Sequence, residues 1–281
     1  MFGEVTTGII PALEKMDTSL PIGIFDSGFG GLTVCRAITD LLPHEDIIYL
    51  GDTARAPYGP RPIAEVRQFA LEGLDWLMEQ GVKALVVACN SASSAALRDI
   101  RERYGVPVVD VIIPSARRAT RITRNGRVGV ISTSATANSG AYFDALAASN
   151  VKLYMKSCPR FVEFVEDGVT SGSEVLEITR EYLTPLKEKD VDTLILGCTH
   201  YPLLSGPISY VMGEDVALVS SSDECARSAF AVLTKLDGLR PLGEQHEGAR
   251  SFYTTGDPGK FAGLGSRLMG DFVSKVEQAV L

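Results

Sequence analysis

Short β-branched runs recur along this 281-residue chain, and amphipathic or polar stretches separate each run from the next. This alternation is typical of parallel strands joined by helices. We therefore expect an α/β fold with doubly wound sheets, in which a ligand lies beyond the carboxyl ends of the strands. The runs are IGIF, DIIYL, ALVVA, VPVVDVII, RVGVIS, VKLYM, DTLILG and VALVS.

The segment from Pro62 to Gln80 shows the helical pattern clearly. It has proline in its first turn, where the missing N–H costs nothing. Its apolar side chains recur at helical spacing, so we expect them to cover one buried face. These side chains are Ile63, Val66, Ala70, Leu74 and Leu77.

An internal duplication narrows the architecture further. KALVVACNSAS aligns with DTLILGCTHYP, and PIGIFDSGFGG aligns with RVGVISTSATA. The spacing nearly agrees, with 66 positions from Gly23 to Cys89 and 69 from Gly129 to Cys198. The repeat predicts two similar, pseudo-symmetric lobes with the active site in the cleft between them.

We expect the chain to cross between the lobes twice. The first crossing is predicted between Pro114 and Asn125, and the return near Ser220 to Asp223, where serine and aspartate precede an apolar helical pattern. The predicted division is a first lobe of 21–114 with 222–281, a second lobe of 115–221, and an N-terminal extension of 1–20.

Composition excludes several classes of protein. The formal net charge is -8 and the chain has no block of lysine and arginine, so we expect no nucleic-acid partner. The N-terminal segment has an acid at Glu4 and no early basic cluster, and no run of eighteen apolar residues follows, so we expect a cytoplasmic protein without a membrane partner.

The five cysteines favour neither a zinc site nor a redox dithiol. They are scattered and lack a CxxC pair, and in a reducing compartment they are expected to be free thiols. His44 and His246 form no metal-binding set with a pair of carboxylates, so no metal is predicted.

Cys89 and Cys198 are the candidate reactive groups. Each ends an apolar strand and precedes polar residues that suit a helix N-terminus, which lowers the pKa of a thiol and offers N–H groups to a carboxylate. Each cysteine alone is more readily a small buried hydrophobic residue than a reactive group. Their recurrence at the same place in both repeats favours function.

Two equivalent thiols that face one cleft suit the inversion of a stereocentre. One thiolate removes a proton from one face of a carbon, and the other thiol returns a proton to the opposite face. An ordinary thiol has a pKa of about 8.5, which allows either state near neutral pH. Because the thiols share a substrate, their measured pKa values would belong to the pair.

Several other polar residues are predicted beside the thiols. Asp26 and Ser27 follow the first strand and precede a glycine-rich turn, although Asp26 could equally be a capping acid. His200 is two positions after Cys198 and could assist it. The turn-rich segment with Tyr58 and Gly59 is expected to form a loop at the same edge, in which Arg55 attracts acidic substrates or is a solvated charge.

The motifs IGIFDSGFGGLTV, YLGDTARAPYG, VVACNSAS, CPRFVEFVEDG and LGCTHYPLL together resemble the glutamate racemases of bacterial cell-wall synthesis. The resemblance extends from about Ile22 to Leu204 in family order. It implies a racemase that interconverts L- and D-glutamate without a cofactor, supplies D-glutamate for peptidoglycan, and forms a homodimer.

The resemblance also implies residue roles. Cys89 matches the base on the D-glutamate side and Cys198 the base on the L-glutamate side. Asp26 matches the acid beside the first thiol, His200 the imidazole beside the second, and Glu166 a further acid near the site. The residues that would hold the ammonium and carboxylates are Ser27, Tyr58, Gly59, Asn90, Ser91 and Thr199.

The chain departs from the family pattern at three places. Ser91 replaces the usual threonine and keeps its hydroxyl. Glu163 stands where proline is common, which bears on local helix geometry and not on catalysis. The extension before Pro21 is longer than in the shortest members.

Two other functions fit the same features. One is racemisation of aspartate or another acidic amino acid on the same pair of thiols. The other is a two-lobed binding protein that closes on an acidic metabolite without reacting, with structural or redox-paired thiols.

Overall fold

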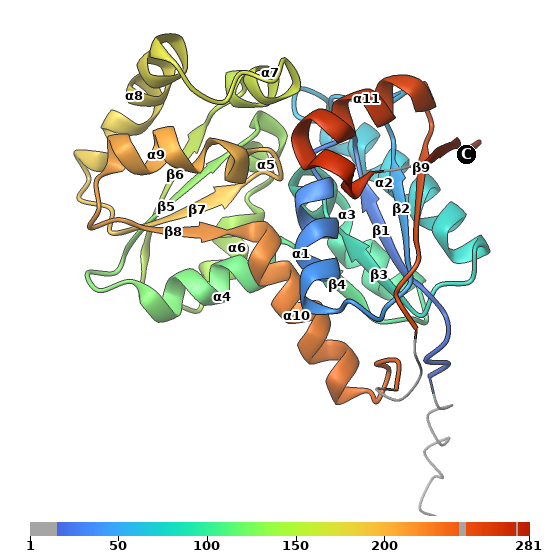
Figure 1. Cartoon of the computed structure of the whole chain (residues 1–281). Helices are drawn as coiled ribbons and strands as arrows, with labels where there is room; N and C mark the ends of the chain where they lie inside the picture. Colours follow the sequence, from blue (N-terminus) through green and yellow to red (C-terminus); the bar gives the residue numbers. More distant parts are fainter. Residues whose placement is uncertain (1–15, 242–245, 274) are drawn as a thin grey trace, which may run out of the picture.

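The computed structural model describes residues 16–241, 246–273 and 275–281. Its strands form two parallel sheets that lie side by side (Figure 1). The strands of the larger sheet are β1 (Ile22–Asp26), β2 (Ile47–Gly51), β3 (Ala84–Val87), β4 (Val108–Asp110), β9 (Arg250–Thr254) and β10 (Val276–Gln278). The strands of the smaller sheet are β5 (Arg127–Ser132), β6 (Lys152–Ser157), β7 (Thr193–Gly197) and β8 (Ala217–Ser220).

Helices cover both faces of each sheet, so the predicted α/β class with doubly wound sheets is confirmed (Figure 1). The α-helices are α1 (Leu32–Leu41), α2 (Ile63–Glu79), α3 (Asn90–Arg103), α4 (Ile112–Ile122), α5 (Ser134–Ser139), α6 (Ala141–Leu146), α7 (Arg160–Glu166), α8 (Ser173–Lys187), α9 (Ser205–Met212), α10 (Ser221–Lys235) and α11 (Pro258–Met269). The 3₁₀ helices are η1 (Tyr201–Leu204) and η2 (Gly270–Phe272).

The two sheets repeat one strand order. The first lobe pairs β2-β1-β3-β4 and the second pairs β6-β5-β7-β8, with β9 and β10 added beside β2. In each lobe the candidate cysteine follows the third strand of the repeat, β3 or β7. Because parallel strands present their carboxyl ends at one edge, both cysteines lie at the ligand edge of their sheets.

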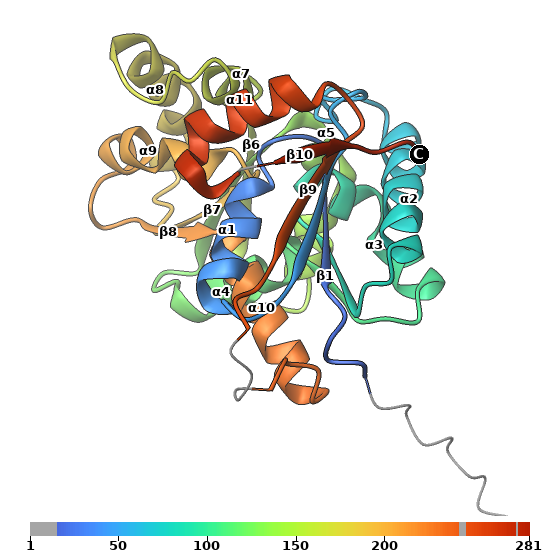
Figure 2. The same cartoon turned by 45° about the vertical axis from the view of Figure 1, so that its right-hand side comes forward.

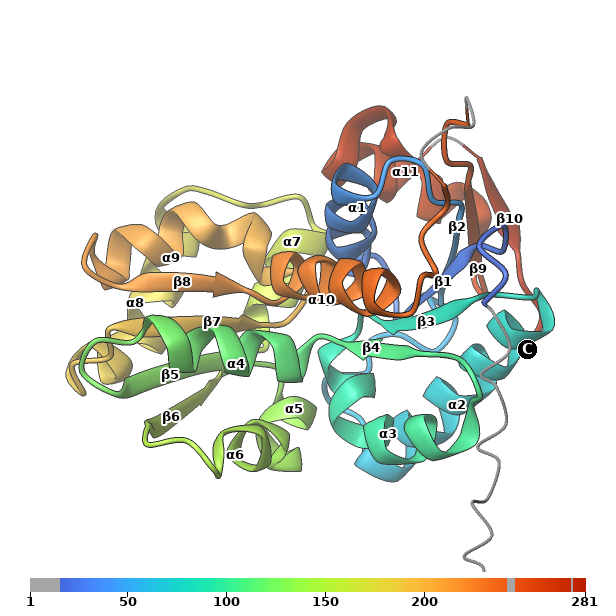
Figure 3. The same cartoon turned by 90° about the horizontal axis from the view of Figure 1, so that it is seen from below.

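The chain crosses between the sheets after β4 and after β8, and the two crossings lie next to each other (Figure 3). Helix α4 follows β4 at once and packs on β7 and β8 of the second sheet. Helix α10 follows β8 and packs on α1 of the first lobe. We keep the division into 21–114 with 222–281 and 115–221 as a proposal. Helix α4 begins at Ile112, three residues before the proposed boundary, and packs on the second sheet. The predicted extension, 1–20, lies mostly outside the described residues.

The strand predicted over VPVVDVII is wrong in length, because β4 ends at Asp110. Asp110 Oδ1 accepts hydrogen bonds of 2.8 Å from the backbone N–H groups of Ile112 and Ile113, so it caps α4. The predicted helix over Pro62 to Gln80 is present as α2, but Ile63 is exposed while the four other predicted side chains are buried.

Three apolar clusters hold the molecule together. One lies between the first sheet and α2 and α3, and a second lies between the second sheet and α8 and α9. The third includes buried residues of both lobes, from Ile24 and Leu32 to Val130 and Ile195. A shared core fixes the lobes against each other, because opening it would expose apolar surface to water.

Strands β9 and β10 were not predicted. They form the outer edge of the first sheet, and the chain ends beside them (Figure 2). Their sequences, RSFYT and VEQ, contain few buried side chains and no apolar run. Within 16–241, 246–273 and 275–281, no helix has both the length and the apolar content that crossing a membrane requires.

Candidate active site

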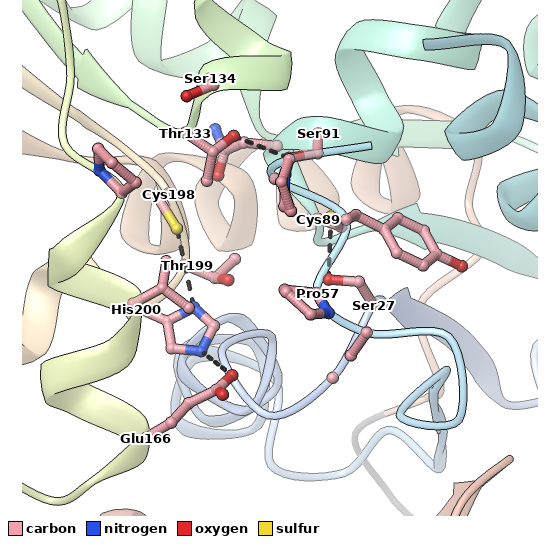
Figure 4. A pocket seen from close by; sticks show the side chains of 18 of the residues that line it. Ser27, Pro57, Cys89, Ser91, Thr133, Ser134, Glu166, Cys198, Thr199 and His200 are labelled. Atoms are coloured by element: carbon pink, nitrogen blue, oxygen red, sulfur yellow. Dashed lines mark hydrogen bonds and ion pairs between the residues drawn. The ribbon is translucent and has the colours of Figure 1, made fainter. Parts of the chain in front are cut away.

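A cavity of about 170 Å³ lies between the lobes, and the motifs of both repeats meet there (Figure 4). It contains all the predicted site residues except Asp26. The predicted residues that line it are Ser27, Tyr58, Gly59, Cys89, Asn90, Ser91, Glu166, Cys198, Thr199 and His200. Figure 4 shows the sulfur atoms of Cys89 and Cys198 on opposite sides of this cavity.

Cys89 is the N-cap residue of α3. Its sulfur accepts from the Ala92 N–H at 3.4 Å, and its thiol donates to Ser27 Oγ at 3.4 Å. Burial, together with a smaller contribution from the negative charge of Asp26, raises the pKa of Cys89 to about 12. The Ala92 amide at the helix N-terminus lowers this pKa as expected, but burial outweighs its contribution, so the net shift is upward.

Cys198 has different surroundings. It follows β7, but a turn and the 3₁₀ helix η1 come next, so the predicted α-helix N-terminus is absent at this cysteine. Its sulfur lies 3.7 Å from Nδ1 of His200, and His200 Nε2 lies 3.1 Å from Glu166 Oε1 (Figure 4).

The surroundings of His200 favour its charged form. Burial lowers its pKa, but hydrogen bonds to Cys198 and Glu166 and their negative charges outweigh burial and raise the pKa to about 10. An imidazolium N–H beside a sulfur stabilises a thiolate. The two thiols are therefore unlike: burial favours the thiol form of Cys89, whereas Cys198 faces an imidazole with a raised pKa.

Asp26 lies behind the cavity wall and is fully buried. Its Oδ1 accepts from the Gly28 N–H at 2.9 Å, while its Oδ2 has no hydrogen-bond partner among the described residues. Burial raises the pKa of this carboxyl. Asp26 thus supports the turn that carries Ser27 and Gly28, and these two residues reach the cavity.

The glycine-rich turn of the first lobe fits closely against the second lobe. A Cβ atom on Gly30 would lie 2.2 Å from Thr199 Oγ1 and 2.5 Å from His200 Nδ1. Thr33, one turn further, donates to the Thr199 carbonyl at 3.0 Å. Only glycine at position 30 allows this approach.

Two further contacts join the lobes at the cavity wall. Ser91 Oγ and Thr133 Oγ1 are 2.9 Å apart, and the Ala135 N–H donates to the Gly59 carbonyl at 2.8 Å. Ser91 keeps the hydroxyl of the threonine that is usual at this position, and this hydroxyl contacts Thr133 of the second lobe.

Arg55 does not line the cavity, and it is not a solvated loop charge. Its Nε donates to Asp52 Oδ2 at 2.6 Å, and it also pairs with Glu72. Asp52, which is fully buried, accepts from the Tyr58 hydroxyl as well. This network fixes the loop that brings Tyr58 to the cavity.

Sequence reasoning missed Thr133 and Ser134, which line the cavity from the start of α5. The alignment of PIGIFDSGFGG with RVGVISTSATA pairs them with Ser27 and Gly28, so the duplication itself was the available signal. Glu163 also lines the cavity, and α7 is helical across it.

The two other histidines lie apart from the cavity. His44 Nδ1 is 2.8 Å from the His246 carbonyl, and His246 Nε2 pairs with Asp46 at 2.7 Å. Among the residues that the structure describes, no group of three His, Cys, Asp or Glu side chains is placed to hold a metal ion.

The family model for Asp/Glu/Hydantoin racemase matches residues 22–229, a span that includes both thiols. The chain belongs to this racemase family. The glutamate racemase of Parafrankia sp. (strain EAN1pec) is 59% identical to this racemase over 92% of the chain and 94% of the relative.

Solved structures agree with the fold. Glutamate racemase from Thermus thermophilus, in complex with β-chloro-D-alanine, is 45% identical, with a TM-score of 0.87 over 94% of this racemase and 98% of that chain. Glutamate racemase from Francisella tularensis, in complex with D-glutamate, is 35% identical, with the same TM-score and coverage. The chain is thus an isomerase of the racemase type, with the two-lobed fold of these enzymes.

Proposed function

We propose that this racemase interconverts L- and D-glutamate without a cofactor, with Cys89 and Cys198 as its two acid–base groups. The observation that carries the proposal is that two thiols, each following the third strand of its repeat, line one cavity from opposite sides. The relative in complex with D-glutamate supports the choice of substrate.

In the proposed reaction from L-glutamate, the Cys198 thiolate takes the α-proton. The C–H bond breaks, an S–H bond forms, and the electron pair remains on the α-carbon beside its carboxylate. The S–H bond of Cys89 then breaks, and its proton forms the new C–H bond on the opposite face. The reverse reaction exchanges the roles of the thiols.

The unlike surroundings of the thiols support this assignment. The His200 imidazolium stabilises negative charge on Cys198, and Glu166 keeps the imidazolium protonated. Burial keeps Cys89 in the thiol form, so it begins as the acid. Before turnover, the two thiols then have the protonation states that deprotonation of L-glutamate requires. After turnover they have those that deprotonation of D-glutamate requires.

Polar groups around the cavity are assigned to the ammonium and carboxylates of the substrate. Asp26 orients the first turn from behind the cavity wall, and Thr133 joins the predicted set because its hydroxyl meets that of Ser91. The remaining residues of the set are Ser27, Tyr58, Gly59, Asn90, Ser91, Thr199 and His200.

We further propose that the enzyme works in the cytoplasm as a homodimer and supplies D-glutamate for peptidoglycan. A bacterial strain that depends on added D-glutamate tests the cellular role, since expression of this chain should remove the requirement. Sedimentation equilibrium tests the dimer, and a monomer at micromolar concentration would contradict it.

The decisive experiment measures circular dichroism of L- and D-glutamate in D₂O without pyridoxal phosphate. The unmodified chain should racemise both and place deuterium at the α-carbon of the product, whereas Cys89→Ala and Cys198→Ala should each abolish turnover. Full turnover by either variant would overturn the two-thiol mechanism.

A substrate panel separates the alternatives. Faster turnover of aspartate than of glutamate would reassign the substrate on the same pair of thiols. If glutamate protects both thiols from an alkylating reagent but no deuterium exchange occurs, the chain is instead a binding protein.

A further inference from the structure

Tyr142 is a fully buried residue of α6 in the second lobe, outside the lining of the cavity. Its ring lies against Gly197, where a Cβ atom would come within 3.2 Å of Tyr142 Cε2. Gly197 is the last residue of β7 and directly precedes Cys198. The ring therefore packs against the backbone that carries the second thiol.

The hydroxyl of Tyr142 reaches the other thiol-bearing turn. Asn90, which directly follows Cys89 and lines the cavity, donates from Nδ2 to the Tyr142 hydroxyl at 3.2 Å. This hydrogen bond crosses from the first residue of α3 in one lobe to α6 in the other.

Ser115 of α4 completes the arrangement. Its hydroxyl donates to the Val111 carbonyl at 2.7 Å, so its oxygen can accept the Tyr142 proton at 3.4 Å. With its single proton used there, the Tyr142 oxygen is left as the acceptor for Asn90. The donor and acceptor roles of Asn90, Tyr142 and Ser115 are thus defined. Helix α4, which carries Ser115, follows the first crossing between the lobes.

We propose that Tyr142 is a positioning residue that holds the two thiol-bearing turns in register across the lobe interface. The inference rests on the proposed function, because the separation of the two sulfurs matters only if both act on one α-carbon. Tyr142 does not line the cavity, and it acts on the two thiols through Asn90 and Gly197.

The expected effect follows from the geometry of proton transfer. A misplacement of about 1 Å can cost about a hundredfold in rate. Removal of the Tyr142 hydroxyl also leaves the buried Asn90 amide without this partner, so the side chain is free to leave its position.

The test is Tyr142→Phe, which keeps the ring against Gly197 and removes the hydroxyl. We expect kcat for glutamate to fall about tenfold or more, with a smaller change in KM. The matched control is Tyr104→Phe, which also removes one tyrosine hydroxyl, partly buried and bonded to Asp75 at 2.7 Å, but in a residue that does not line the cavity. This control should keep its kcat.

A second readout does not depend on turnover. Alkylation by iodoacetamide, mapped by mass spectrometry, should change in rate at both Cys89 and Cys198 in Tyr142→Phe and at neither in Tyr104→Phe. A structural loss alone would lower the melting temperature of both variants without this selective change. Ser115→Ala, which removes the acceptor of the Tyr142 proton, should act in the same direction by a smaller factor.

The outcomes separate the two proposals. If Tyr142→Phe matches the unmodified chain within twofold in kcat and in both alkylation rates, the positioning role is overturned while racemisation stands. If the unmodified chain does not racemise glutamate, the proposed function fails, and the alkylation rates still decide whether Tyr142 holds the two turns. Should Tyr142→Phe not fold, unchanged kcat and alkylation in Ser115→Ala would overturn the role.

Discussion

His200 Nε2 lies 3.1 Å from Oε1 of Glu166, and the other ring nitrogen of His200 faces the sulfur of Cys198 at 3.7 Å. An imidazolium can donate from both nitrogens, to the carboxylate and to a Cys198 thiolate, and the negative charges of both partners favour this form of the ring. Glu166 is partly exposed at the edge of the cavity, whereas His200 is buried. The carboxylate thus sets the charge beside a thiol that it does not touch.

Replacing Glu166 with glutamine should lower the His200 pKa from about 10, because it removes a negative charge and an ion-paired acceptor. We expect the alkaline limit of kcat/KM for glutamate to move down by about one to two pH units. Initial rates between pH 6.5 and 10.5 measure this shift. An unchanged alkaline limit would show that the ring charge does not control the reaction.

The same charge makes a prediction for stability. The folded pKa of His200 is raised above the ordinary histidine value of 6.5, so its protonation stabilises the fold fully below pH 6.5, and this contribution is lost as pH rises towards about 10. The free energy of unfolding of the unmodified chain should therefore exceed that of Glu166→Gln by more at pH 6 than at pH 10. Urea denaturation at both pH values tests this, and a constant difference would contradict it.

Ser27→Ala removes the oxygen that lies 3.4 Å from the sulfur of Cys89. A hydrogen bond to a charged group contributes about 1.5–3 kcal/mol, so kcat/KM should fall about tenfold to a hundredfold when the hydroxyl can no longer stabilise the thiolate. Because the two enantiomers of free glutamate have equal free energy, kcat/KM must fall equally in both directions. Steady-state kinetics with each enantiomer measure the loss. Full activity with both would show that the Ser27 hydroxyl does not contribute to catalysis.

Gly30→Ala should separate the lobes locally, because the new Cβ would overlap Thr199 Oγ1 and His200 Nδ1. We expect a loss of about 1–3 kcal/mol in stability and at least about a hundredfold in kcat. Gly263→Ala is the matched control, since a Cβ there meets no atom within 4 Å in the middle of α11. This control should retain activity and gain about 0.5–1 kcal/mol. Normal turnover by Gly30→Ala would contradict the close approach.

Lys83→Met tests a buried ion pair far from the chemistry. Lys83 is fully buried, pairs with Glu45, and donates to the Thr18 carbonyl at 2.9 Å. Removing one partner leaves the carboxylate uncompensated, which should cost about 3–5 kcal/mol of unfolding free energy while kcat at 20 °C stays near that of the unmodified chain. Lys275→Met, at an exposed pair with Glu277, should leave stability nearly unchanged. Equal denaturation midpoints for the two variants would refute the prediction.

Much of the fold was predictable, because parallel strands buried on both faces appear as apolar runs in the sequence. The duplication predicted two lobes, and the two sheets share one strand order. Strands β9 and β10 escaped prediction, since their sequences, RSFYT and VEQ, contain no apolar run and few buried side chains. The end of β4 was misplaced because Asp110 caps a helix in the middle of an apolar run.

The site was predictable where its residues adjoin the end of a strand. It was less predictable where burial determines a pKa or where contacts with the other lobe determine a residue's role. Cys89, Cys198 and His200 meet at one cavity as expected. The raised pKa of Cys89 could not be foreseen, because it comes from the depth of the cavity and not from the local motif. Tyr142 carries no motif at all, and its contacts with Asn90 and Gly197 exist only once the lobes have packed.

The shared strand order makes this single chain the covalent counterpart of a dimer with one site on its axis. In a true homodimer both sides of such a site would be identical. Joined in one polypeptide, the halves are free to differ, and they place Asp26 opposite Ser132 and Asn90 opposite Thr199 in the aligned repeats. The two sides of the cavity can therefore present different polar groups to a molecule that has no symmetry of its own, while each side keeps one sulfur.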